Sequence, residues 1–245
     1  MSRVVRLEIC VDKFEGASAA VAGGADRIEL CSSLSEGGLT PSAGLMRAVA
    51  ALRVPAYAMI RPRSGLFHFS EAEVEIMLTD IAAAREAGLA GVVIGAQTAE
   101  GGLDGPVLER LVAAAGDLGT TLHRVIDVVP DPLAALDQAL SLGIERILTS
   151  GAQPYAPDGV GLIREMVQRA GDALSVMPGC GLAPDNVGAV VAQTGATEVH
   201  AACRRRVTGD PAFSDFDPPS GRYETSASDI QEMKAALRGA YDARP

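Results

Sequence analysis

Apolar residues along this chain gather in short runs that repeatedly follow a glycine. Four times a helical stretch ends at Gly, and an apolar strand begins about three residues later. Glycine ends helices readily because it adopts the left-handed backbone conformation without steric cost. The four junctions span Gly24–Ile28, Gly88–Val92, Gly143–Ile147 and Gly195–Val199. Each interval between them is long enough for two strand–helix units, so the pattern predicts four pairs of such units.

Four further apolar strands lie between these junctions, at residues 6–11, 56–60, 120–124 and 174–177. Helical stretches follow the strands, among them residues 132–142 and residues 70–87, where Ser70 and Glu73 have the spacing of a capping box. Strict alternation of strands and helices predicts a parallel sheet, and eight such units close naturally into a barrel of about 250 residues. We therefore predict an α/β protein, a (β/α)8 TIM barrel that forms a single domain over residues 1–245.

A doubly wound dinucleotide-binding fold also alternates strands and helices, but it requires a G-x-G-x-x-G turn directly after the first strand. Here that turn reads V-D-K-F-E at residues 11–15, and a similar string at residues 179–184 lacks the third glycine. The barrel is therefore favoured. A long irregular segment with three prolines, residues 201–225, precedes the C-terminal helix. We expect it either to cover one barrel mouth or to form an oligomer contact.

Composition and charge narrow the range of partners. The chain is 48% hydrophobic but only 4% aromatic, so Ala, Val, Leu and Ile must fill the core. Its formal net charge of -10 argues against nucleic acid as a partner, and we interpret the run Arg204–Arg206 as a solvated or ion-paired loop. No apolar stretch approaches the roughly 18 residues of a membrane span, and the N-terminus lacks a signal-peptide pattern. We therefore expect a cytoplasmic protein that binds neither nucleic acid nor membrane.

Polar residues alternate with apolar ones along the first two strands, where the pattern R-x-E-x-C occurs twice. A period of two places Glu8 and Cys10 on one face of the first strand, and Glu29 and Cys31 on one face of the second. A buried cysteine is most often only a small apolar residue, and four cysteines without a CxxC pair should be reduced thiols. Buried carboxylates, by contrast, need cationic partners.

Cationic side chains stand at the ends of later strands. Arg61 ends the third strand, and His123 and Arg124 end the fifth, with Asp127 three residues further on. The active face of such barrels lies at the C-terminal ends of the strands. A structural ion-pair network is the alternative to a catalytic role for these residues. The candidate catalytic residues are therefore Glu8, Glu29, Arg61, His123, Arg124 and Asp127.

Glycine-rich turns late in the chain predict a second kind of site. Ser150 and Gly151 follow the sixth strand, and Gly179 and Gly181 follow the seventh. Backbone N–H groups in such turns, close to helix N-termini, bind small anions such as phosphate. Tight turns need glycine for their own sake as well, so a purely structural role stays open.

The lysines and histidines exclude two mechanisms. Lys13 and Lys234, the only lysines, lie outside the predicted strands, which excludes an aldolase with a Schiff-base lysine in mid-strand. The three histidines form neither H-x-H nor H-E-x-x-H, so a hydrolytic zinc site is unsupported. His200, at the end of the last strand, could serve as a general acid or metal ligand, although a histidine at such a position is more often structural.

Ordered short motifs make the chain similar to one known family. They occur in this order: Glu8-Ile-Cys-Val-Asp12, Gly23-Gly-Ala-Asp-Arg-Ile-Glu-Leu-Cys31, Gly37-Gly-Leu-Thr-Pro-Ser42, Met59-Ile-Arg-Pro-Arg63, His123-Arg124 with Asp127, Leu148-Thr-Ser-Gly151 and Met177-Pro-Gly179. This string, which runs from about residue 7 to residue 204, resembles the CutC proteins.

The resemblance implies a cytoplasmic (β/α)8 barrel that is linked by name to copper homeostasis, is often a homo-oligomer and binds Cu(I). Cys10 and Cys31 would be the copper ligands, and soft thiolates do select Cu(I). The chain departs from the family twice, because G-C-G replaces G-G-G at residues 179–181 and H-A-A-C-R replaces H-x-S-A-R at residues 200–204. The added thiols of Cys180 and Cys203 either supply further ligands or merely pack.

Two functions of different classes follow. The first is copper handling without turnover, in which Cys10 and Cys31 bind the ion. The second is an enzyme, a lyase or isomerase of a small anionic metabolite, phosphorylated or not. There a strand glutamate would act as base, the strand-end arginines would bind an oxyanion and His123 would act as acid. Arginines do not attract a cuprous ion, which favours the enzyme, whereas the resemblance favours copper handling, the function we expect. A scaffold without any ligand has only the acidic surface in its favour.

Overall fold

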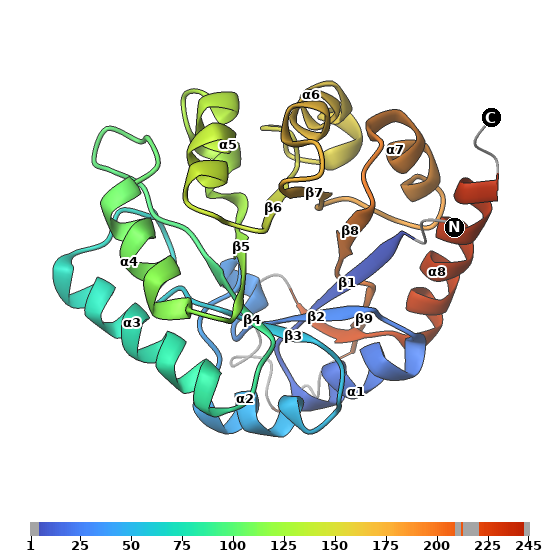
Figure 1. Cartoon of the computed structure of the whole chain (residues 1–245). Helices are drawn as coiled ribbons and strands as arrows, with labels where there is room; N and C mark the ends of the chain where they lie inside the picture. The colour runs from blue at the N-terminus through green and yellow to red at the C-terminus, as the bar shows by residue number, and fades with distance from the viewer. Residues whose placement is uncertain (1–4, 209–211, 213–220, 243–245) are drawn as a thin grey trace.

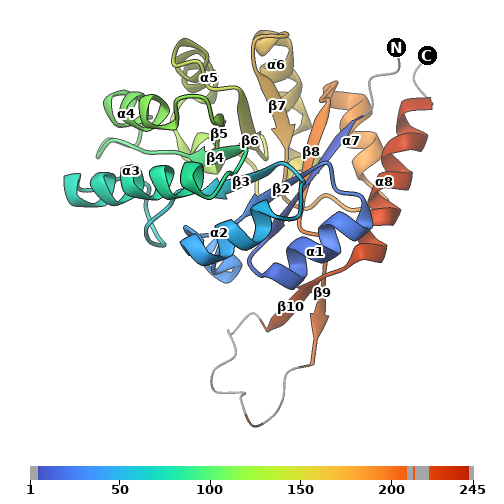
Figure 2. The ribbon, with the colours of Figure 1, turned by 60° about the horizontal axis from the view of Figure 1, so that its bottom comes forward.

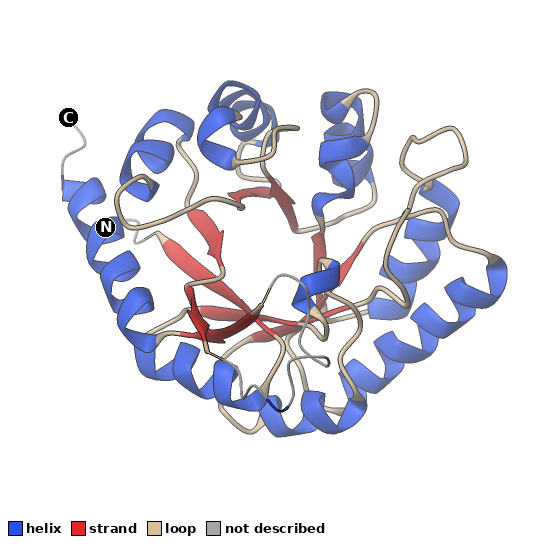
Figure 3. Ribbon diagram, turned by 180° about the vertical axis from the view of Figure 1, so that it is seen from behind, coloured by secondary structure: helices blue, strands red, loops and turns tan. Residues whose placement is uncertain are grey.

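Eight strands of the computed structural model run parallel inside a ring of helices (Figure 1 and Figure 3). The structure describes residues 5–208, 212 and 221–242. The strands are β1 (Arg6–Val11), β2 (Arg27–Leu30), β3 (Ala56–Met59), β4 (Gly91–Ile94), β5 (Gly119–Leu122), β6 (Arg146–Thr149), β7 (Ser175–Pro178) and β8 (Glu198–Ala201). Their ladders join in the order β7-β6-β5-β4-β3-β2-β1-β8, and the sheet curls into a nearly closed barrel. This architecture confirms the predicted (β/α)8 TIM barrel.

The α-helices of the described chain cover the outside of the barrel (Figure 3). They are α1 (Phe14–Gly23), α2 (Ala43–Ala50), α3 (Glu71–Glu86), α4 (Gly105–Ala115), α5 (Pro132–Ser141), α6 (Val160–Ala170), α7 (Val187–Thr194) and α8 (Ala227–Asp242). Short 3-10 helices follow three of the strands: η1 (Leu34–Glu36), η2 (Arg124–Val128) and η3 (Ala156–Asp158). Within the described residues, none of the helices has the length and apolarity needed to cross a bilayer.

Several helices begin and end at the capping and glycine residues that the sequence predicts. The Ser70 hydroxyl accepts the N–H of Glu73, and the Glu73 carboxylate accepts the N–H of Ser70 at 2.8 Å, which confirms the capping box at the start of α3. Gly24 and Gly195 lie directly after α1 and α7, with φ of 85° and 78°. Only glycine adopts such φ values without strain, so these two junctions are helix ends of the predicted kind.

The fifth strand ends earlier than its sequence pattern predicts. The apolar run favours a strand over residues 120–124, whereas β5 spans Gly119–Leu122. His123 is the N-cap of η2, and its ring accepts the N–H of Val125 at 3.1 Å. That side-chain hydrogen bond turns the chain out of the strand, because it satisfies a backbone donor that the next ladder position would otherwise use.

Apolar and charged residues occupy opposite sides of the strands. On β1, Leu7, Ile9 and Val11 are fully buried and belong to the core between strands and helices. Glu8 alternates with them and is equally buried, but it lies inside the barrel with charged residues of other strands. Both sides of β1 are therefore buried, the outer side among apolar residues and the inner side among charged ones.

A two-stranded hairpin extends from the end of β8 (Figure 2). Its strands, β9 (Arg204–Val207) and β10 (Arg222–Thr225), pair antiparallel. Arg205 forms an ion pair with Asp229, and the guanidinium carbon of Arg204 lies 4.8 Å from the centre of the Tyr223 ring. The predicted irregular segment at 201–225 thus contains this hairpin, while its residues 209–211 and 213–220 lie outside the described part.

Candidate binding site at the barrel mouth

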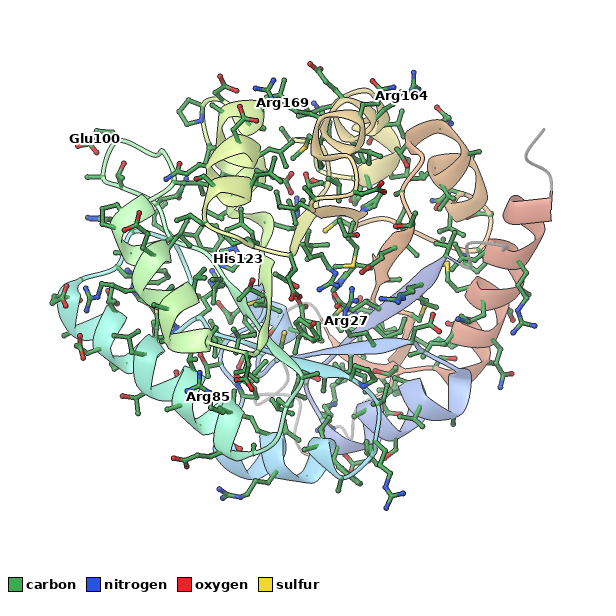
Figure 4. The ribbon with its side chains drawn as sticks, viewed as in Figure 1. Arg27, Arg85, Glu100, His123, Arg164 and Arg169 are labelled. Atoms are coloured by element: carbon green, nitrogen blue, oxygen red, sulfur yellow. The ribbon has the colours of Figure 1, made fainter. Side chains whose placement is uncertain are left out.

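A cavity of about 860 Å³ opens at the C-terminal ends of the strands. Residues that end or follow strands line it: Cys10 on β1, Glu29 on β2, Arg61 after β3, His123 and Arg124 after β5, and His200 on β8. Figure 4 shows Arg27 inside the ring of strands, and Arg164 and Arg169 on the outer helix α6. The volume is that of a site for a small molecule, and its position is where such barrels hold ligands.

The ring of Tyr57 lies in the barrel interior, close to the first residues of β4 and β5. A Cβ added at Gly91 would lie 2.3 Å from this ring, and one at Gly119 would lie 2.1 Å from its hydroxyl, so neither position has room for a side chain. The guanidinium carbons of Arg27 and Arg146 lie 5.4 and 5.3 Å from the ring centre. Two cations therefore pack on one aromatic ring in the barrel interior.

These two arginines anchor an ion-pair network inside the barrel. Arg27 forms ion pairs with Glu8 and, at 2.5 Å, with Glu198, which also binds Arg146 at 2.6 Å. All four side chains are less than a tenth exposed. Burial alone would raise the pKa of Glu8, but hydrogen bonds and the positive charges of His200 and Arg27 lower it to about 2. Glu8 is therefore an ionised partner in a structural network.

His200 connects this network to the cavity. Its Nδ1 lies 2.8 Å from Glu8 Oε1, and its Nε2 lies 3.8 Å from Glu29 Oε2. Burial lowers the pKa of His200, but the Glu29 charge and the bonds to Cys10 and Glu8 raise it well above its usual value. The pairing of β1 with β8 places Glu8 directly beside His200, a contact that the sequence did not disclose.

Three different donor types converge on the floor of the cavity. Cys10, Glu29 and His200 each offer one ligand atom, and these atoms all lie within 4.8 Å of one another. Glu29 Oε1 is buried and has no hydrogen-bond partner, and burial raises the pKa of this carboxyl group. Cys31 lies beside them, with its Sγ 3.6 Å from Glu29 Oε2, and burial raises the pKa of its thiol. We call Cys10, Glu29 and His200 the floor cluster.

Arg61 is held by backbone carbonyl groups instead of carboxylates. Its Nη1 donates to the carbonyls of Glu36 at 2.9 Å and Gly38 at 3.2 Å, and its Nη2 donates to Gly65 at 3.0 Å. Its own N–H donates to the Thr40 hydroxyl. The glycine motif at residues 37–42 therefore packs against the arginine motif at 59–63, and hydrogen bonds between the two segments fix Arg61 in the cavity wall.

His123 is a neutral histidine in the same wall. Burial and the nearby charge of Arg61 lower its pKa from 6.5 to about 3. Its ring packs on Phe67 with the ring centres 4.6 Å apart, and a Cβ added at Gly95 would lie 2.3 Å from it. The ring is thus confined on both sides, and its Nε2 is buried without a partner.

Arg124 and Asp127 bind each other and the loop after β6. Arg124 Nε donates to Asp127 at 2.8 Å, and its Nη2 donates to the Ser150 hydroxyl at 2.8 Å. Asp127 accepts the N–H groups of Ser150 and Ala152, and Gly151 N–H donates to Thr149. Asp127 therefore already occupies the loop that the sequence predicts as an anion site. An external anion would have to displace Asp127 at Ser150 and the Thr149 hydroxyl at Gly151.

The loop after β7 contributes to the cavity mouth. Gly181 and Cys180 line the cavity, as does Cys203 at the start of the hairpin. The N–H of Gly179 donates to the carbonyl of Thr149 at 2.9 Å and is not free for a ligand. Cys180 and Cys203 adopt positive φ of 73° and 43°. Together with Cys10, three of the four cysteines border this cavity.

Sequence reasoning did not identify Arg27, Tyr57, Phe67 or Arg146 as parts of this region. Arg27 and Arg146 begin their strands, and a charge at the start of a strand usually faces solvent. They pair with glutamates because side chains of several strands point into the barrel at the same level, which one strand's pattern does not reveal. The signal that could have found Arg27 is the repeated R-x-E pattern, since alternation places that arginine on the same side as Glu29.

The sequence as a whole is similar to proteins of one family. The CutC family model matches residues 5–205. The CutC family protein of Rhizobium meliloti (strain 1021) is 48% identical over 243 residues, which cover 97% of each chain. The corresponding protein of Photobacterium profundum is 53% identical over 197 residues, 80% of each chain.

Solved structures agree with this assignment. The CutC of Streptococcus agalactiae, whose name links it to copper homeostasis, matches with a TM-score of 0.77 and 28% identity over 80% of this chain and 98% of its own. Thiamine phosphate pyrophosphorylase of Pyrococcus furiosus matches with a TM-score of 0.60 at 13% identity over 98% of each chain, which shows a shared fold alone. By sequence and by fold, the chain belongs to the CutC family.

Proposed function

We propose that this protein binds Cu(I) on the floor of the cavity, with Cys10 and His200 as ligands and Cys31 as a further thiol beside them. Because neighbouring groups raise the pKa of His200, the ion displaces a ring proton from His200 on binding. The observation that carries the proposal is the convergence of one thiol, one imidazole and one carboxylate within 4.8 Å in the floor cluster. The family's link to copper supports the choice of metal.

The donor set agrees with a soft or borderline metal ion. Thiolate and imidazole are the ligands that Cu(I) takes in proteins, whereas carboxylate prefers harder ions. Glu29 therefore supplies negative charge near the ion, and its unpartnered Oε1 is a buried acceptor that a cation would satisfy. The half-buried Cys10 borders the cavity, which gives the ion a path of entry.

A thiol site of this kind requires reduced cysteines. All four cysteines are free thiols in the structure. Because cysteines persist as thiols in reducing compartments, the proposal includes a cytoplasmic location. The ion is the cargo of the protein, and the proposal involves no turnover.

An anaerobic competition titration tests the proposal. Cu(I) is distributed between the protein and a strong chromophoric chelator, and the protein is compared with its Cys10→Ser plus Cys31→Ser variant. We expect one tight site per chain, weakened about a hundredfold or more in the double variant because a thiolate ligand is lost.

Cys180→Ser is the matched control, since its thiol borders the same cavity outside the floor cluster. It should bind Cu(I) as tightly as the unaltered protein. Weak binding that the double substitution leaves unchanged would refute the proposal.

A further inference from the structure

The wall of the cavity across the barrel from β1 contains two buried N–H groups without an acceptor. Among the described residues, four buried side-chain polar atoms lack a hydrogen-bond partner, and three of them belong to residues that line this cavity: Glu29 Oε1, Arg61 Nε and His123 Nε2. An unpaired buried polar group is destabilising, and its concentration in one cavity indicates a ligand that pairs with it. The floor cluster accounts for Glu29, and it leaves the other two atoms unexplained.

Both remaining atoms are hydrogen-bond donors. The N–H of Val125 donates to Nδ1 of His123, so Nδ1 carries the lone pair and the ring proton is on Nε2. The Nε of Arg61 always carries a proton, and both terminal nitrogens of that guanidinium already donate to backbone carbonyls. The two residues are only 7% and 3% exposed. They need an oxygen atom that accepts.

Phe67 fixes both donors in place. The guanidinium carbon of Arg61 lies 5.0 Å from the centre of the Phe67 ring, and the His123 ring centre lies 4.6 Å from it. Gly95 closes the other side of the His123 ring. Donors that are held before a ligand arrives lose little entropy on binding, which is how anion sites are organised.

Charge selects the class of ligand. Arg61 forms no ion pair with a carboxylate in the described part of the chain, and Arg124 lines the same cavity with its side chain 38% exposed. An uncompensated guanidinium in a largely buried wall favours an anion.

We propose that the Arg61–His123 wall binds a small organic oxyanion, with carboxylate or phosphate oxygens accepting from Arg61 Nε and His123 Nε2. This is a second site in the cavity, and it uses no residue of the floor cluster. It gives the protein a metabolite ligand in addition to the metal ion proposed above.

Histidine labelling reports directly on this site, because the chain has only three histidines. In protein labelled with [15N]histidine, His123 should show the neutral Nε2–H tautomer at neutral pH. Sodium pyruvate and inorganic phosphate are then titrated separately. We expect a saturable shift of the His123 Nε2 resonance with at least one of them, and none at the exposed His68. A response to pyruvate alone identifies carboxylate as the recognised group, and a response to phosphate alone identifies phosphate.

Variants separate the proposed contact from a structural effect. His123→Asn keeps an oxygen that can accept the N–H of Val125 but is too short to place an N–H at the Nε2 position, and it should weaken calorimetric binding of the responding anion about tenfold or more. Arg61→Lys removes Nε, and if that variant fails to fold, His123→Asn decides alone. Cys10→Ser should bind the anion normally, so this site and the copper site are tested independently.

Two results would overturn the inference. One is that neither anion shifts the His123 Nε2 resonance before the exposed His68 also begins to shift. The other is that His123→Asn binds the responding anion as tightly as the unaltered protein, since the donor would then have no role.

Discussion

Arg27 compensates the charge of two carboxylates that are buried inside the barrel. It touches Glu8, Glu198 and the Tyr57 ring, and it is 4% exposed. Without Arg27, Glu198 would keep only Arg146 and Glu8 only His200 as a close cationic partner, so both buried carboxylates would lose part of their charge compensation. The residues of this network are thus more interdependent than those of any surface ion pair.

Replacing Arg27 by Met should therefore destabilise the protein strongly. We expect the free energy of unfolding to fall by about 3–5 kcal/mol, because two buried carboxylates each lose a cationic partner. Arg169→Met is the matched control: its ion pair with Asp137 is nearly half exposed on both sides, so its loss should leave the free energy of unfolding almost unchanged. Urea denaturation of the three proteins measures both values, and equal losses would contradict the argument.

His123 gives the protein a pH dependence with a defined sign. Its pKa falls from 6.5 to about 3 on folding, so between these values the unfolded chain binds a proton that the folded chain does not. Stability should therefore decrease as the pH falls below 6.5, by about 1 kcal/mol between pH 6.5 and 5.5 from this residue alone.

The difference between the unaltered protein and His123→Asn isolates this effect, because the carboxylates titrate in both proteins. The unfolding free energy, measured by denaturant titration at a series of pH values, should fall more steeply for the unaltered protein below pH 6.5. Parallel curves would show that His123 is not kept neutral by the fold.

At the scale of elements, one side chain of β3 restricts which residues fit on the two strands beside it. The Tyr57 ring of β3 reaches across to β4 and β5, where Gly91 and Gly119 leave room for it. A glycine inside a strand is ordinarily unfavourable, so its presence on two neighbouring strands follows from this ring.

Gly119→Ala should destabilise the protein by about 1–3 kcal/mol, because the new methyl group would collide with the Tyr57 hydroxyl. Gly161→Ala, in α6, meets no atom within 4 Å and should stabilise by about 0.5–1 kcal/mol, since alanine is the better helix former. Thermal unfolding of both variants gives the two signs. A neutral Gly119→Ala would mean that the ring moves aside.

The elements themselves could largely be predicted from the sequence, whereas the site could be predicted only in part. Periodicity and glycine stops depend on neighbours along the chain, and they located all eight strands and the cap at Ser70. The floor cluster depends on which residues of β1, β2 and β8 share a register, and single-sequence patterns do not contain that information. Strand alternation places Cys10 on one face of the first strand and Glu29 on one face of the second, but their convergence with His200 depends on the pairing of β1 with β2 and β8.

At the scale of the whole molecule, the floor cluster joins the two ends of the fold. β1 pairs with β8, so residues at the beginning and end of the barrel sequence meet at this seam. Association of the chain with itself, which the family resemblance implies, stays a prediction. The proposed metal ion would bind on both sides of the seam, at Cys10 and His200.

Cu(I) should for this reason stabilise the folded barrel as a unit. With free Cu(I) at about a hundred times the dissociation constant, the gain is about 2.7 kcal/mol, provided that the unfolded chain does not bind the ion. Anaerobic thermal unfolding with and without Cu(I) measures it, and the Cys10→Ser plus Cys31→Ser variant should gain at most about 0.4 kcal/mol at the same concentration. An equal gain in that variant would place the ion elsewhere.

The loop that fixes Arg61 gives the cavity two chemically different sides. Because this guanidinium is neutralised by no carboxylate of the described chain, the wall of Arg61 and His123 is electropositive, while the floor around Cys10 and Glu29 offers acceptors and soft donors. The side of the cavity at Arg61 and His123 thus differs in charge from the side at Cys10 and Glu29. We therefore expect a molecule with one anionic end to bind with that end toward Arg61 and His123, on the side of β3 and β5, and with its other end toward β1 and β8.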